Sequence, residues 1–330
     1  MTDRKAGACM NELEYATAVA RIRVHETRLL GADKIEQLIA AESYRDALKR
    51  LGDLGYDVQS GDASVILKTE QQNAWQLLCE IAPDKSELEF LTVRNSFLNL
   101  KAALKCVVSG LEADAYFCAP ANVPDETIVS AATTRDFSLL PEYMQDVAER
   151  AYTILTTTGD GQHADVIIDK KSLETYLDFA ARLRDESLTK LAQFTVAAAD
   201  MKIAYRCAKT ANDAAFLDDA LVACDEVDCG ELKAAALAGE EEVIDCIARL
   251  GYSEAAELLR TSPAAFEKWC DDFVLSTVQG AKYEAFGFLP LAGYYIAKEN
   301  EIKTLRIVLA AKENELPAEM IRERVRMLYV

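Results

Sequence analysis

Histidine is scarce in this sequence, and the cysteines lack the spacing of a metal site. The 330 residues include two histidines, His25 and His163, and nine cysteines, of which no two form a C-x-x-C pair. A structural zinc site needs thiolate or imidazole ligands paired at short spacing. The sequence therefore argues against a metal centre. Nine thiols without a disulfide framework are typical of a protein in a reducing cytosol, and we expect Cys106 and Cys207 to be small core residues.

Motifs for phosphate binding and nucleophilic catalysis are also missing. No G-x-x-x-x-G-K-[ST] run is present, and the loop of Gly159, Asp160 and Gly161 has neither a preceding strand nor a third glycine. His25 belongs to a polar helical face and His163 to this loop, so both are predicted to be exposed side chains and not bases. The 55 acidic residues single out no pair of carboxylates. We predict no catalytic residue, no cofactor and no metal ligand, and hence a protein that is not itself an enzyme.

Long uncharged runs are absent as well. The stretch 285–297 carries no charge, but it is broken by Pro290 and is too short to cross a bilayer as a helix. The first ten residues lack the apolar core of a secretory signal. With 36 basic and 55 acidic residues the net charge is −19, which repels a phosphate backbone and suits basic protein partners. We therefore expect no nucleic-acid binding and no membrane span.

What the sequence does contain is helical periodicity. Apolar residues recur every three or four positions in two segments: Val93, Phe97, Leu100, Leu104, Val108 and Leu111; and Leu13, Ala16, Ala20 and Val24. Such spacing predicts amphipathic helices. Alternating β-branched runs are rare, and 165–169 is the best strand candidate. The predicted fold class is all-α.

Helix boundaries can be read from several residues. Asp33 and Glu36 resemble a capping box, and Ser262 before Pro263 predicts another helix start. We interpret 159–161 as a loop and a coarse break in the chain. All seven prolines fall where a helix could begin or end: Pro83, Pro120, Pro124, Pro141, Pro263, Pro290 and Pro317.

One helical segment occurs three times, 101 residues apart. The copies open on Val93, Phe194 and Tyr295. Each then carries a polar residue, an apolar residue and a lysine: Asn99, Leu100 and Lys101; Asp200, Met201 and Lys202; Glu301, Ile302 and Lys303. A fixed period of this length predicts three similar modules, with approximate bounds 1–118, 119–219 and 220–330. A proline-initiated helix predicted after Pro124 and another after Pro317 support the repeat.

The three lysines are the candidate partner-binding residues. On a helical wheel Lys101 stands at the edge of the apolar stripe, whereas Asn99, Asp200 and Glu301 are expected on the opposite side. A lysine at such an edge usually buries its methylenes and keeps its ammonium in water, and we favour this structural role. The alternative is a cationic ring of Lys101, Lys202 and Lys303 that faces acidic groups of a partner or of the protein itself.

An aromatic segment near the C-terminus has two interpretations. Four aromatic residues and two glycines surround Pro290 within 286–295. The segment is either a close helix-packing element or an exposed docking surface, and packing is favoured.

The C-terminal sequence PLAGYYIAKENEIKTLRIVL at 290–309 is the most specific part of the chain. It continues into Leu316 and Pro317, into Glu319 and 321–324, and into 328–330. Together with YATAVARIR at 15–23 and Leu29 and Leu30, with 99–101, and with Asp165, Asp169 and Lys170, it resembles the C subunit of V/A-type ATPases, called the d subunit in eukaryotes. The resemblance covers essentially the whole chain.

The resemblance implies a fold and a role. Members of this family are all-helical funnels of three similar domains around a pseudo-threefold axis. It implies a non-catalytic central-stalk rotor subunit on the cytoplasmic face of the membrane, between the central shaft (subunits D and F) and the membrane rotor ring of proteolipid subunits. In that position a protein couples ATP hydrolysis or synthesis to H⁺ or Na⁺ transport. The N-terminal helix is then able to pack with the C-terminal module.

A helical-repeat scaffold or adaptor whose concave surface binds other proteins is the alternative. It explains the period, the acidity and the missing active site equally well. Only the C-terminal signature separates the two functions.

Overall fold

The computed structural model is helical throughout the part of the chain that it describes. It describes the backbone of residues 2–113, 116–210 and 214–330, with side chains from residue 13 onward. No strand occurs in these ranges, so the all-α class is confirmed. The strand candidate 165–169 is wrong, because it lies inside a helix. Asp160 accepts a hydrogen bond from the His163 N–H (2.9 Å) and starts that helix, and Ile167 and Ile168 join its buried face.

Two compact units make up the chain. Unit 1 consists of Met1–Leu88 and Leu258–Val330, and unit 2 consists of Glu89–Glu257. The helices of unit 1 are α1 Thr2–Glu26, α2 Ala32–Ile39, α3 Tyr44–Asp53, α4 Ala63–Ile81, η1 Lys85–Leu88, α14 Pro263–Val278, η4 Gln279–Tyr283, α15 Leu289–Glu313 and α16 Ala318–Arg324.

The helices of unit 2 come from one continuous stretch. They are α5 Glu89–Ser109, α6 Asp125–Thr134, η3 Phe137–Leu139, α7 Glu142–Thr157, α8 Gly161–Leu183, α9 Glu186–Thr210, α10 Ala214–Ala220, α11 Cys229–Ala238 and α12 Glu240–Arg249. One further helix, α13 Ser253–Thr261, crosses from unit 2 into unit 1.

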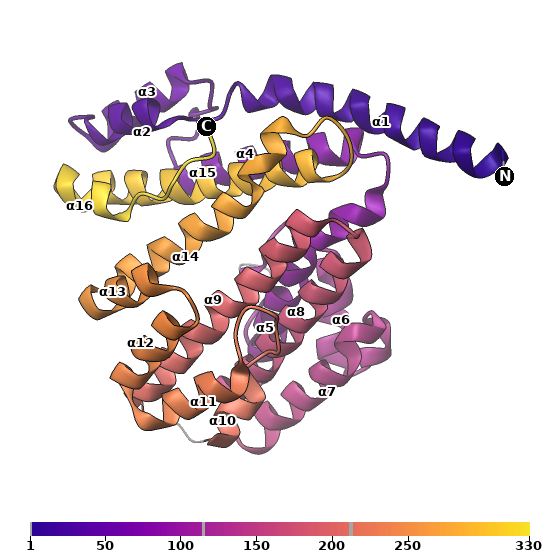
Figure 1. The fold of residues 1–330 in the computed structure, drawn as a ribbon, viewed down its shortest axis with the longest axis vertical. Helices are drawn as coiled ribbons and strands as arrows, with labels where there is room; N and C mark the ends of the chain where they lie inside the picture. The colour runs from indigo at the N-terminus through magenta and orange to yellow at the C-terminus, as the bar shows by residue number, and fades with distance from the viewer. Residues whose placement is uncertain (1, 114–115, 211–213) are drawn as a thin grey trace. The chain divides into compact units, whose positions relative to one another are not determined.

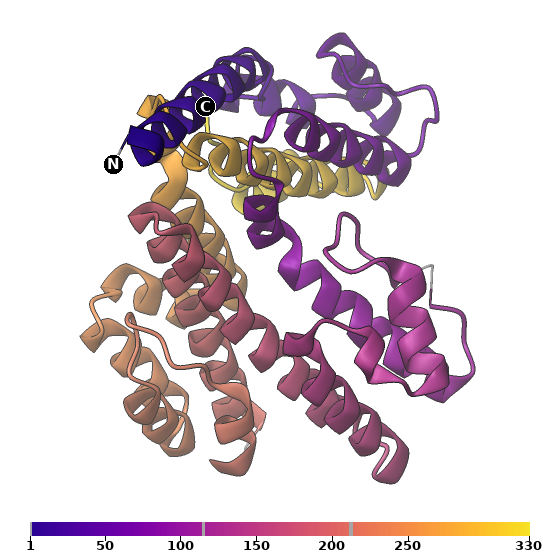
Figure 2. The ribbon, with the colours of Figure 1, turned by 90° about the vertical axis from the view of Figure 1, so that its right-hand side faces the viewer.

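Unit 1 is built around α15. This helix packs against α1, α2, α3, α4, α14 and α16, and Figures 1 and 2 show α1 and α4 beside it. Its apolar face meets the N-terminal helices in one core, in which Leu38, Leu51, Leu67, Leu305 and Leu309 are all buried. Burying that many leucines supplies much of the free energy that holds the two ends of the chain in one unit.

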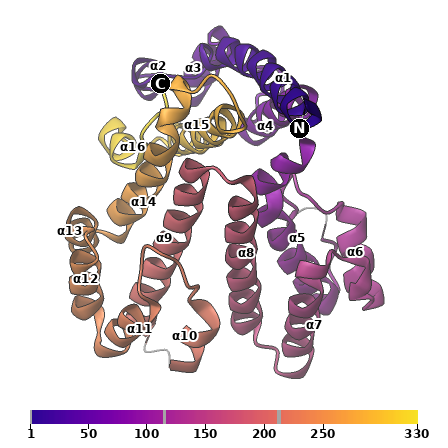
Figure 3. The same ribbon diagram turned by 45° about the vertical axis from the view of Figure 1, so that its right-hand side comes forward.

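Unit 2 is organised by three long helices, α5, α8 and α9. Helix α8 packs on α5, α7 and α9, while α9 also contacts α10, α11 and α12, as Figure 3 shows. Helix α5 contacts α6, α7 and α8, so it is covered on more than one face. The predicted stripe is buried from Val93 to Leu104, but Val108 (41% exposed) and Leu111 (61% exposed) lie beyond it.

Proline and glycine mark the helix ends. All seven prolines stand at helix edges or in loops, as predicted; Pro124 and Pro317 directly precede α6 and α16. Three short-loop connections share a glycine with positive φ just after a helix: Gly55 after α3 (98°), Gly159 after α7 (70°) and Gly251 after α12 (99°). Only glycine takes this conformation without strain, and it ends the helix there. The break predicted at 159–161 is thus a tight turn between α7 and α8, which pack on each other.

The start of α2 differs from the prediction. The residue before the helix is Gly31, and Asp33 lies within the first turn and caps nothing. The chain path here is fixed from outside the helix, because the Leu30 N–H is bound by Glu301 of α15. Ser262 stands before Pro263 at the start of α14, as predicted, without a side-chain capping bond.

Helix α1 buries a different face from the predicted one. Leu13 is 71% exposed and Val24 58% exposed, whereas Tyr15, Val19 and Ile22 are buried. Both sets have helical spacing, but the second is bulkier and its burial removes more apolar area from water. The Tyr15 hydroxyl also donates a hydrogen bond to Glu87, which attaches α1 to the end of the α4–η1 segment.

The aromatic segment at 286–295 is mainly a packing element, as favoured. Tyr294 and Tyr295 are buried, and only Phe286 is exposed. Gly293 permits the close approach: a Cβ there would lie 2.6 Å from the Ala281 Cβ.

Candidate partner-binding site

The three candidate lysines lie on the long helices α5, α9 and α15, but in different surroundings. Lys101 is largely covered (19% exposed), and its Nζ lies 2.7 and 2.9 Å from the two carboxylate oxygens of Asp169 on α8. Lys202 is half-buried and Lys303 is exposed. Neither of these two forms an ion pair within the described residues. The structure thus gives Lys101 a structural partner and leaves the other two ammonium groups available.

The partners of α5 explain part of the sequence pattern. Asp165 and Asp169 are one turn apart on α8, and they pair with Lys105 (2.5 Å) and Lys101, which are one turn apart on α5. Two parallel salt bridges therefore join the helices. Both are partly exposed, so each contributes at most about 1 kcal/mol.

The polar residues before the three lysines have the more informative environment. The helical wheel predicts Asn99, Asp200 and Glu301 on the side away from the apolar stripe, and all three are buried, at 0%, 0% and 2% exposed. A helical wheel distinguishes one apolar face and does not predict this burial, which arises because α5, α9 and α15 each pack against several helices.

Asn99 and Asp200 each hold a loop that lies later in the chain. The Asn99 Oδ1 accepts the Cys118 N–H (2.7 Å), and its Nδ2 donates to the Cys118 carbonyl (3.0 Å). The Asp200 carboxylate accepts the Val222 N–H, 3.2 Å from both oxygens. Cys118 precedes the start of α6, at Asp125, by seven residues, and Val222 precedes the start of α11, at Cys229, by the same number. The two contacts are therefore equivalent.

Glu301 makes the third contact of this kind. Its carboxylate accepts the Leu30 N–H just before α2. It also accepts the Tyr56 hydroxyl (2.5 Å) and lies 2.6 Å from the Lys298 Nζ, which in turn is 3.1 Å from Glu70. We call Asn99, Asp200 and Glu301 the anchor residues. Each ties a long helix to a loop that precedes a short helix, namely α6, α11 or α2.

Burial and charge shift the pKa values in these contacts. Burial raises the pKa of the Asp200 carboxyl to about 7, although the Val222 N–H lowers it. Burial alone would lower the pKa of Lys298, but the carboxylates of Glu301 and Glu70 outweigh it and raise that pKa above its ordinary value. The pKa of Tyr56 is raised mainly by burial and next by the negative charge of Glu301. The anchor residue of unit 1, Glu301, thus belongs to a paired buried ion network, whereas Asp200 has no cationic partner in contact within the described residues.

The histidines differ from the prediction of two exposed side chains. His25 is half-buried beside Tyr294, with ring centroids 6.2 Å apart, and burial lowers its pKa. His163 lies in the first turn of α8, and its Nε2 is 2.9 Å from an Asp219 oxygen. Cys106 and Cys207 are buried, as expected. Among the described side chains, no three His, Cys, Asp or Glu residues are grouped as metal ligands would be.

The sequence pattern singles out the three lysines, whose role in partner binding stays a prediction, and does not indicate the contacts of the anchor residues. The available signal was a polar residue at the same register in three otherwise apolar helical segments. Their partners lie 19, 22 and 271 residues away, beyond any local pattern.

Comparison with known proteins identifies the family. The model of the family "ATP synthase (C/AC39) subunit" matches residues 18–324. The chain belongs to this family, the C subunits of V/A-type ATPases. It is similar to the C subunit of the V-type sodium ATPase of Enterococcus hirae, with 24% identity over 330 residues that cover 96% of this chain and 99% of that protein. Within the described residues, no helix has both the length and the apolarity to cross a membrane.

Proposed function

We propose that this protein is a non-catalytic central-stalk rotor subunit of a V/A-type ATPase. It links the central shaft, subunits D and F, to the proteolipid rotor ring, as a peripheral subunit on the cytoplasmic face of the membrane. Its role is mechanical: it couples ATP hydrolysis or synthesis in the head to H⁺ or Na⁺ movement in the membrane. The observation that carries the proposal is the family match over 18–324.

The anchor residues support three modules of similar construction. Asn99, Asp200 and Glu301 stand at 101-residue intervals on α5, α9 and α15, and each binds the backbone of a loop before a short helix. This repetition supports the modules 1–118, 119–219 and 220–330 and a pseudo-threefold funnel. Helix α1 packs on α15, as expected if the N-terminal helix belongs with the C-terminal module.

A protein that couples rotation to transport must transmit torque without deforming, and the polar anchors suit that requirement. Hydrogen bonds from a buried side chain to a loop backbone fix the loop in one position, because breaking them leaves buried polar groups unpaired. Apolar packing alone lets helices slide more easily.

The proposal is tested by deleting the gene and restoring it on a plasmid. The membrane ATPase is then assayed for ATP hydrolysis and for ATP-driven uptake of H⁺ and of Na⁺. We expect deletion to abolish ion uptake while the detached head still hydrolyses ATP, and the plasmid to restore uptake. Ion pumping that survives deletion, or a protein that fails to co-purify with the rotor ring, contradicts the proposal and favours the scaffold alternative.

A further inference from the structure

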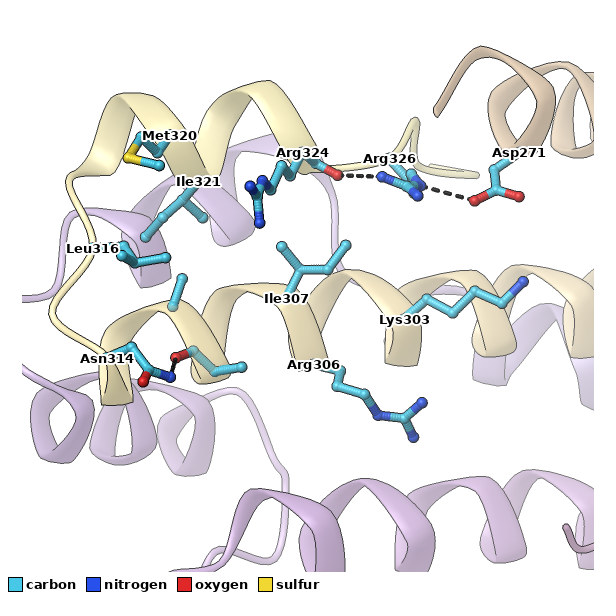
Figure 4. Close-up of a pocket in the computed structure, with 12 residues that line it drawn as sticks. Asp271, Lys303, Arg306, Ile307, Asn314, Leu316, Met320, Ile321, Arg324 and Arg326 are labelled. Carbon is cyan, nitrogen blue, oxygen red and sulfur yellow. Dashed lines mark hydrogen bonds and ion pairs between the residues drawn. The ribbon is translucent and has the colours of Figure 1, made fainter. Parts of the chain in front are cut away.

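An open groove lies between α15 and α16 in unit 1, with a volume of about 520 Å³. Figure 4 shows its two ends. Leu316, Met320 and Ile321 gather near the turn that joins the two helices, and Lys303 lies at the far end. Arg324 extends from α16 toward α15 between these ends, whereas Arg306, which also lines the groove, starts on α15 and extends away from α16 in this view. The groove is apolar at one end and cationic at the other.

The basic side chains in and beside the groove fall into a paired and an unpaired group. Arg322, which lies on α16, pairs with Glu36. Arg326, just after α16, pairs with Asp271 (2.9 Å). Lys303, Arg306 and Arg324 are exposed and form no ion pair within the described residues. In a chain of net charge −19, three unpaired cations around one groove make a local site for negative charge.

The apolar end is accessible as well. Met320 is 41% exposed and Ala310 is exposed, above a buried Ile321. Flexible methionine side chains adapt to varied apolar partners. From Lys303 to Asn314 the groove follows α15 for eleven residues, roughly 16 Å or three helical turns.

We propose that this groove binds an acidic amphipathic helix from another subunit of the ATPase. The inference rests on the proposed function, because it takes the partner from the same complex. The partner presents carboxylates to Lys303, Arg306 and Arg324, and apolar side chains two turns away to Met320 and Ala310. This is the helix-in-groove mode of recognition.

The distribution of charge on this protein favours a short acidic segment as the groove's partner over an extended anionic surface. Screening limits the reach of each charge to about 8 Å at physiological salt, so a compact helix meets mainly the three cations. A bilayer or a nucleic acid would also meet the acidic remainder of the chain and be repelled.

The first test measures peptide binding to the full-length protein by fluorescence anisotropy. The probe is a fluorescein-labelled, 16-residue alanine-based helix with three Glu on one face and two Leu two turns away; a second probe replaces Glu by Gln. We expect the acidic peptide to bind about tenfold more tightly and to weaken at high salt. Equal binding of the two peptides, or no binding of either, overturns the proposal.

Matched variants locate the binding. The triple variant Lys303→Gln, Arg306→Gln and Arg324→Gln should weaken binding of the acidic peptide about tenfold. The control replaces three exposed cations elsewhere in unit 1, Arg28, Lys49 and Lys68, by Gln and should change it less than twofold. Met320→Ser should weaken both peptides. Equal losses in the triple variant and the control would show a general charge effect and contradict a groove.

The second test identifies the occupant in the intact complex. Benzoylphenylalanine replaces Ala310 in the groove or Lys49 outside it, and the purified ATPase is irradiated. We expect an adduct from position 310 alone, with an acidic helical segment of another subunit. No adduct, or one with lipid, in a complex that retains this chain overturns the groove proposal only. Absence of the chain from the complex contradicts the proposed function instead.

Discussion

The carboxylate of Glu301 binds the backbone N–H of Leu30, which lies 271 residues earlier in the chain. Glu301 is 2% exposed, and it also accepts the Tyr56 hydroxyl and pairs with Lys298. One side chain of α15 therefore positions the N-terminal segment where α2 begins. Asn99 and Asp200 hold Cys118 and Val222 in the same way. The three buried side chains thus make similar contacts at intervals of 101 residues.

Removing Glu301 should destabilise unit 1. In Glu301→Ala, Lys298 keeps Glu70 but loses its closer partner, and the Leu30 N–H is left unpaired. We expect the free energy of unfolding to fall by about 3 kcal/mol. Both tryptophans, Trp75 and Trp269, belong to unit 1, so their fluorescence during urea unfolding reports this unit.

The control for this change lies on the same helix. Glu313 is exposed, and Glu313→Ala should alter the free energy of unfolding by less than about 0.5 kcal/mol. Equal urea midpoints for the two variants would show that Glu301 contributes nothing beyond its helix propensity.

Asp200 should make unit 2 less stable as the pH rises. Its pKa is about 7 in the folded protein and lies near 4 in the unfolded chain, so the folded state binds the extra proton between these values. The stability due to protonation is fully present below pH 4 and is lost as the pH rises through 7. Asp200→Asn, which copies Asn99, should therefore be more stable than the wild type at pH 8.5, by up to about 4 kcal/mol, and equal to it near pH 4.

The reciprocal change provides the control. Asn99→Asp places a carboxylate beside Asp125, whose Oδ1 is 3.2 Å from the Asn99 Nδ2, and should destabilise the protein most at high pH. Thermal unfolding followed by circular dichroism between pH 4 and 8.5 measures both. A pH-independent difference between Asp200→Asn and the wild type would contradict a buried ionisable Asp200.

The local features of this fold were accessible from the sequence, and the anchors were not. Pro124, Pro263 and Pro317 predicted helix starts because proline fixes its own φ and lacks an N–H. The buried state of Asn99 depends on α6, α7 and α8 enclosing α5, which no helical wheel contains. The exposed face of α1 has the same cause: the periodicity fits two faces, and packing against α15 selects one.

Gly293 should be intolerant of any side chain. In Gly293→Ala the new Cβ would lie 2.6 Å from the Ala281 Cβ and 3.2 Å from the Tyr329 hydroxyl, so η4 and the C-terminal segment would have to shift. We expect a loss of about 1–3 kcal/mol in the tryptophan-monitored unfolding. Gly280→Ala, in the same region with open space around its Cβ position, is the control and should be nearly neutral. A neutral Gly293→Ala would mean that η4 is not tightly packed on α15.

The three lysines should differ in their effects on stability and assembly when each is changed to methionine, which keeps the aliphatic stem and removes the charge. Lys101→Met loses the bond to Asp169 and should cost up to about 1 kcal/mol of stability with little effect on assembly. Lys303→Met breaks no ion pair among the residues that the structure describes, so it should leave the melting temperature unchanged and weaken assembly in a salt-dependent way. Lys202, half-buried and without an ion pair in the described residues, should fall between them. Co-purification of the chain with the membrane ATPase at low and high salt measures assembly. Equal losses of assembly from all three variants would favour a cationic ring of Lys101, Lys202 and Lys303. A partner bound only in the groove on α15 would not contact Lys101, so Lys101→Met would then leave assembly unchanged.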